Sequence, residues 1–106
     1  MSEQDARKAI SEWVSIVAEE IAEEHEGHDV SDMVHEAVDG SAWVIYYHQA
    51  ASIVGIADSD EIDNAYDDAR ELQGTDTYWE LMQVMAYSIL RARVNEELRE
   101  TYSIEV

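Results

Sequence analysis

Residues 4–26, QDARKAISEWVSIVAEEIAEEHE, decide how this chain folds. Their apolar residues recur at intervals of three and four, which is the stripe of an amphipathic helix; they are Ala6, Ile10, Trp13, Val14, Val17, Ala18 and Ile21. Gly27 follows, and we expect it to end the helix, because glycine readily adopts the conformation that terminates helices. Glutamates crowd the opposite face of the same helix. The stretch therefore predicts a helical fold and an acidic surface together.

Two further helical segments follow Gly27. A short helix is predicted to begin with Asp29 or Ser31 as its N-cap and to end before Gly40. Residues 41–54 are almost continuously apolar, and we interpret them as a buried central helix. A strand is the alternative for the WVIYY segment within them, since β-branched and aromatic residues favour strands. No neighbouring segment alternates with period two to pair with such a strand.

Two capping signals divide the rest of the chain. The spacing Asp58-x-x-Glu61 has the form of a capping box and predicts a fourth helix that ends before Gly74. Thr77-x-x-Glu80 repeats the signal and is followed by an apolar stripe that predicts a fifth helix to about residue 100. We therefore expect an all-α fold: a small acidic bundle of about five helices, with residues 1–106 forming a single domain.

The charge is the most unusual property of the composition. The chain has 106 residues with 25 Asp and Glu against 6 Lys and Arg, which gives a formal net charge of -19. Such a protein repels nucleic acid and anionic membranes and attracts basic surfaces. Apolar residues make up 46%, too many for a disordered acidic tail. The sequence has no cysteine and no apolar run long enough to cross a membrane, so we expect a soluble, cytoplasmic protein.

The candidate partner-binding residues are carboxylates on the first, second and fourth predicted helices: Glu19, Glu20, Glu23, Glu24, Glu26, Asp29, Asp32, Glu36, Asp39, Asp60, Asp63, Asp67, Asp68 and Glu71. The five glutamates of the first helix lie within eight residues, or about one charge per 2.4 Å of helix axis. Duplex DNA carries about one charge per 1.7 Å. The two densities are comparable, and this favours a protein that imitates nucleic-acid phosphates. An acidic face without a partner and a high-salt adaptation are the alternatives.

A resemblance supports the mimic. The segment DVSDMVHEAVDGSAWVIYYHQAASIV, residues 29–54, resembles the corresponding part of the Ocr family of phage antirestriction proteins, which imitate a B-DNA duplex. The segment LMQVMAYSILRARVNEELRE, residues 81–100, is similar to that family's long penultimate helix. Together the two segments cover about half of the chain. One additional residue lies between Asp39 and Tyr46, and the sequence contains no strongly acidic tail of the kind found in that family.

The resemblance implies a helical homodimer that binds a type I restriction-modification enzyme in the host cytoplasm, without catalysis and without binding nucleic acid itself. Its dimer contact would be apolar, and the candidates, which are core residues first, are Tyr46, Tyr47, Trp79, Met82 and Met85. Other phage inhibitors, including some anti-CRISPR proteins, also have acidic helical surfaces. A small acidic module that recognises one basic protein through aromatic anchors therefore remains open.

The sequence does not favour an enzyme or a cofactor. His25, His28 and His35 suggest a metal cluster, but Gly27 is expected to end the helix that would align the first two, so we predict no metal site. No nucleophile motif or glycine-rich phosphate loop occurs. Carboxylates are so abundant that no pair is singled out for acid–base catalysis.

Overall fold

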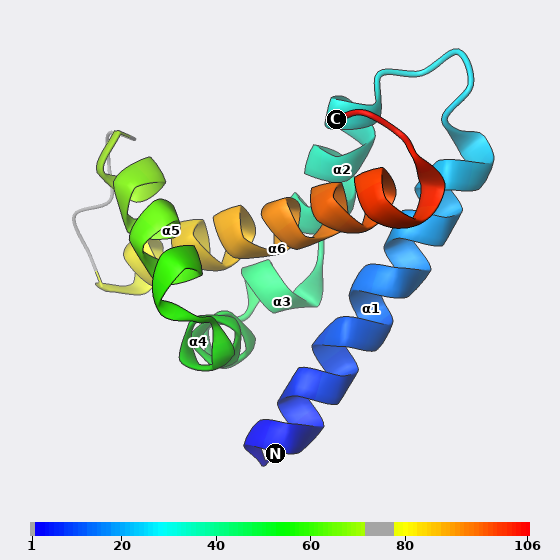
Figure 1. The fold of residues 1–106 in the computed structure, drawn as a ribbon. Helices are drawn as coiled ribbons and strands as arrows, with labels where there is room; N and C mark the ends of the chain where they lie inside the picture. The colour runs from blue at the N-terminus through cyan, green and yellow to red at the C-terminus, as the bar shows by residue number, and fades with distance from the viewer. Residues whose placement is uncertain (1, 72–77) are drawn as a thin grey trace.

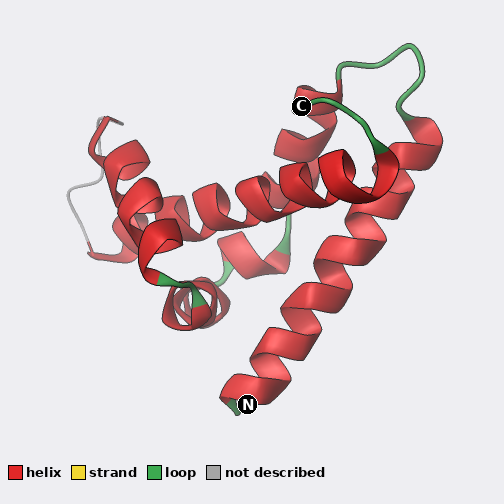
Figure 2. Ribbon diagram, viewed as in Figure 1, coloured by secondary structure: helices red, strands yellow, loops and turns green. Residues whose placement is uncertain are grey.

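The computed structural model describes residues 2–71 and 78–106, which form six α-helices and contain no strand (Figures 1 and 2). The helices are α1 (Glu3–Glu24), α2 (Val30–Asp39), α3 (Ala42–Ile45), α4 (Tyr47–Ile56), α5 (Ser59–Glu71) and α6 (Tyr78–Tyr102). The all-α prediction is confirmed. The strand alternative for WVIYY is wrong, because that segment lies in α3, α4 and the residue between them.

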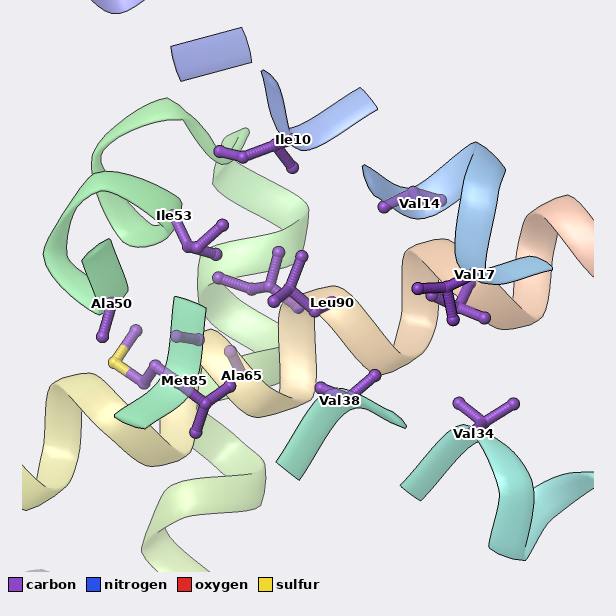
Figure 3. Packing of buried hydrophobic residues seen from close by; sticks show 14 of the residues in the cluster. Ile10, Val14, Val17, Val34, Val38, Ala50, Ile53, Ala65, Met85 and Leu90 are labelled. Atoms are coloured by element: carbon purple, nitrogen blue, oxygen red, sulfur yellow. The ribbon is translucent and has the colours of Figure 1, made fainter. Parts of the chain in front are cut away.

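The central element is α6. It contacts each of the other described helices, and in Figure 1 α4 and α5 lie to one side of the view and α1 and α2 to the other. Its buried residues cover more than one face, so other helices pack around it; they are Met82, Met85, Ala86, Ser88, Ile89, Leu90, Val94 and Leu98. Figure 3 shows side chains of several helices gathered at this helix, among them Ile10, Val38, Ile53, Ala65 and Leu90.

The prediction of one central helix over residues 41–54 is wrong. The segment forms two helices, because Tyr46 has an extended backbone (φ -95°, ψ 126°) that ends α3 and begins α4. Aromatic and β-branched residues are mediocre helix formers, so the local preference for continuing the helix is weak. Gln83 of α6 compensates for the break, since its side-chain amide donates to the carbonyl oxygens of Val44 (3.1 Å) and Ile45 (2.9 Å).

A tight turn joins α1 to α2. The helix ends at Glu24, slightly earlier than predicted, and the N–H of His28 donates to the carbonyl of His25 at 3.0 Å. Gly27 in this turn has a φ of +79°, a conformation that residues with a Cβ atom rarely adopt. Asp29 then caps α2 by accepting from the N–H of Asp32 at 3.3 Å, as the first of the two predicted alternatives requires.

The capping box at the start of α5 is confirmed. The N–H of Glu61 donates to the carboxylate of Asp58 at 2.9 Å, and the N–H of Asp58 donates to Oε1 of Glu61 at 3.2 Å. The predicted helix end at Gly74 and the capping residue Thr77 lie outside the described residues. Within the described ranges, none of the helices combines the length and apolarity needed to span a membrane.

Candidate functional site

All fourteen carboxylates that were predicted to bind a partner lie on the surface of the protein. They project from α1, α2 and α5, and from the turn between α1 and α2. The apolar stripes of these helices face the core, so the polar faces are left to solvent. Most of the carboxylates are therefore held on regular helices, whose backbones fix their relative positions.

The first acidic group lies where α1 and α2 meet. The turn at Gly27 reverses the chain and places α2 against α1. Glu20 and Glu24 of α1 and Glu36 of α2 consequently line one shallow groove of about 310 Å³, together with Ile21, Met33 and Ala37. Acids that are separated along the chain thus form one continuous anionic surface.

The second acidic group lies on α5. This helix packs against α6, where Asp68 and Glu71 line a pocket together with Val84 and Tyr87. Val84 and Tyr87 also line a groove that contains Asp39 of α2, so the acids of α5 and α2 flank the same part of α6. Asp68 also has a structural contact, because its carboxylate accepts from the hydroxyl of Ser88 at 2.6 Å.

A third acidic group was missing from the sequence prediction. Glu96, Glu97 and Glu100 of α6 line a pocket of about 230 Å³ against α1, beside Arg93. Burial and the nearby charges of Glu19, Glu97 and Glu23 raise the pKa of the Tyr102 phenol. Glu19 and Glu23 of α1 are thus near enough to Tyr102 of α6 to act on its phenol. The glutamates of α6 are close together in the sequence, but the arginines of the same segment drew attention away from them.

Few of these charges are neutralised by the protein itself. Arg7 pairs with Glu3 at 2.8 Å on the surface of α1, and Arg93 pairs with Glu61 between α5 and α6. Two other arginines contact aromatic rings, with Arg91 5.5 Å from the centre of the Tyr87 ring. With 25 acids and 6 basic residues, one-to-one pairing would still leave 19 carboxylates without a cation.

The apolar residues proposed for a dimer contact divide into two classes. Met82 and Met85 are buried in the chain's own core and offer almost no surface to a partner, which corrects their place in the predicted contact. Tyr46 and Trp79 are 62% and 50% exposed. Tyr47 is half-buried and stacks on Trp79 with ring centres 4.6 Å apart. We call Tyr46, Tyr47 and Trp79 the aromatic face.

An apolar groove of about 560 Å³ opens beyond this face, between α2, α3 and α6. Its lining residues are His35, Asp39, Val44, Ile45, Gln83, Val84 and Tyr87. Nδ1 of His35 and the hydroxyl of Tyr87 share a hydrogen bond of 2.6 Å across it. The groove was not expected, because the break at Tyr46 exposes Ile45 and could not be predicted from local sequence.

The histidines do not converge on one site. Nδ1 of His25 bonds the carbonyl of Ala22 at 2.8 Å, while His35 bonds Tyr87. Across residues 2–71 and 78–106 no group of three or more acidic, histidine or cysteine side chains is arranged to hold a metal ion.

No family model, curated protein or solved structure matches this chain.

Proposed function

We propose that this protein is a DNA mimic that occupies the DNA-binding groove of a host defence enzyme, a type I restriction-modification enzyme. The observation that carries the proposal is the fixed carboxylate surface of α1, α2 and α5, in which all fourteen nominated acids are exposed. It acts stoichiometrically in the cytoplasm, without catalysis and without binding nucleic acid.

The dimensions of the molecule support this proposal. Its longest extent is 38 Å, close to one turn of duplex, which is about 34–36 Å. Lysines and arginines that neutralise phosphates along such a turn would meet the acidic groups around α6. Individual exposed ion pairs are weak, so affinity arises from many fixed charges and falls steeply with added salt.

The test is a competition assay. A type I restriction enzyme is bound to labelled duplex DNA and titrated with this protein at low and at physiological salt. We expect displacement at near-stoichiometric protein, weakening as salt rises. Retention of the DNA at all protein concentrations would reject this target.

A homodimer formed through the aromatic face belongs to the same proposal. The exposure of Tyr46 and Trp79 supports it, since stable interfaces are enriched in such residues. Because each copy carries a charge of -19, association should strengthen as salt screens the repulsion. Light scattering would give twice the chain mass at high salt and a lower mass for Trp79→Ser. A monomer under all conditions would contradict the dimer.

A second function, an acidic module for one basic partner, is favoured by the apolar groove. If the protein has that function, replacing one apolar residue near the groove would reduce binding more than removing several carboxylates. The two functions are thus separated by the same set of variants.

A further inference from the structure

Carboxylates alone do not explain how such a protein would select one target. Phosphate contacts position a DNA-binding protein without reading sequence, and a surface that imitates phosphates attracts basic grooves in general. Selectivity between targets needs a contact that is not a charge. The apolar groove between α2, α3 and α6 is a candidate for it.

The polar groups inside the groove already have partners. Gln83 donates to the carbonyls of Val44 and Ile45, and His35 bonds Tyr87. Apart from the Asp39 carboxylate, the groove therefore presents few unsatisfied donors or acceptors to a ligand. Its apolar lining consists of Ile45, Val84, Tyr87 and the largely buried Val44. Such a surface recognises an apolar side chain by burial.

The surroundings of the groove are anionic. Asp39 lines it and is exposed, and Glu36 lies one turn earlier on the same helix. Arg91 lies near the ring of Tyr87 and disfavours a second cation there, whereas Asp39 is the carboxylate among the lining residues. A second copy of this chain would bring another net charge of -19 toward these carboxylates. Charge complementarity therefore favours a basic partner over a second copy.

We propose that the groove binds a segment of the target protein in which one large apolar residue is flanked by lysines or arginines. This rests on the proposed function for the statement that the target is a basic DNA-binding protein. The apolar residue enters between Val44, Ile45 and Val84, and a flanking cation meets Asp39. The carboxylate surface then sets the rate of encounter, and the groove slows dissociation.

The experiment uses two fluorescent synthetic peptides of equal charge. One carries a single tryptophan between lysines, and the other has alanine in its place. Anisotropy gives both affinities for the wild-type protein, for Ile45→Asn and for the control Ile16→Asn. Ile45 and Ile16 are 50% and 56% exposed, so neither substitution should unfold the chain, and Ile16 does not line the groove.

We expect the tryptophan peptide to bind the wild type about tenfold more tightly, as burial of one large side chain allows. Ile45→Asn should remove this difference in affinity between the two peptides, and Ile16→Asn should retain it. Methyl NMR should show shifts at Val44, Ile45 and Val84 on addition of the tryptophan peptide. Equal affinity of the two peptides, or a ratio that survives Ile45→Asn, would overturn the proposal. Shifts of the same methyl groups on concentrating Trp79→Ser alone, in which the aromatic contact is weakened, would assign the groove to a second copy and also overturn it.

The outcomes separate this inference from the proposed function. DNA displacement with no preference for tryptophan would reject the groove and leave mimicry in place. A preference for tryptophan that depends on Ile45, without displacement of DNA from a restriction enzyme, would reject that target and leave the groove as the contact for another basic protein.

Discussion

Arg93 of α6 binds Glu61 of α5 through two hydrogen bonds, with Nε 2.8 Å from Oε2 and Nη2 2.9 Å from Oε1. Glu61 also accepts the N–H of Asp58, so one carboxylate both caps α5 and fixes it to the central helix. Both side chains are largely shielded from solvent. Glu61 therefore has a structural role, whereas most carboxylates of this protein have no cation to pair with.

Replacing Glu61 with alanine should destabilise the protein by about 2 kcal/mol, because the cap and the charge-assisted bonds are lost together. Urea unfolding measures the change. The control is Glu3→Ala, which removes the exposed pair with Arg7 and should cost less than about 0.5 kcal/mol. Equal effects of the two substitutions would contradict the role assigned to Glu61.

The Glu61 pair should also be sensitive to acid. Hydrogen bonding to Arg93 lowers the pKa of Glu61 below the ordinary glutamate value of 4.5, so the stabilisation from this pair is fully present above that value. It is lost as the pH falls through the lowered pKa, where the carboxylate becomes neutral. The difference in unfolding free energy between wild type and Glu61→Gln should be constant near neutral pH and shrink in this acidic range. A difference that grows on acidification would reverse the sign and refute the assignment.

Neutralising the acidic end of α1 should move stability and binding in opposite directions. In a variant with Glu19, Glu20, Glu23 and Glu24 all changed to Gln, two repulsive i,i+4 pairs disappear, each worth a few tenths of a kcal/mol. The melting temperature should rise at low salt. DNA displacement should weaken strongly, with a shallower dependence on salt. The single substitution Glu20→Gln, as a control, should change binding little. Full activity of the fourfold variant would count heavily against mimicry.

Gln83 should be required for the break between α3 and α4. Gln83→Met keeps the approximate size of the side chain but leaves the carbonyls of Val44 and Ile45 without their donor, at a cost of about 1–3 kcal/mol. Gln49→Met on the exposed face of α4 is the matched control and should be nearly neutral. Thermal unfolding compares the two variants. A neutral Gln83→Met would show that water replaces the amide.

Local signals predicted the starts of α2 and α5 well. The Asp29 cap and the Asp58–Glu61 box are written within four residues each, and the structure confirms both. The break at Tyr46 could not be found this way, because it is compensated by Gln83, which is far away in the sequence. Periodicity also could not separate a residue buried in its own chain from one buried in an interface, as Met82 and Met85 show.

The position of α6 in the chain has a consequence for biosynthesis. Every helix that packs on α6 precedes it in sequence, so residues 1–71 leave the ribosome before the element that covers their apolar faces exists. A nascent chain at that stage would expose the apolar faces of several helices, and mainly its negative charge would oppose association with other chains. The acids that we assign to binding would therefore also limit aggregation during synthesis, until α6 emerges and covers these apolar faces.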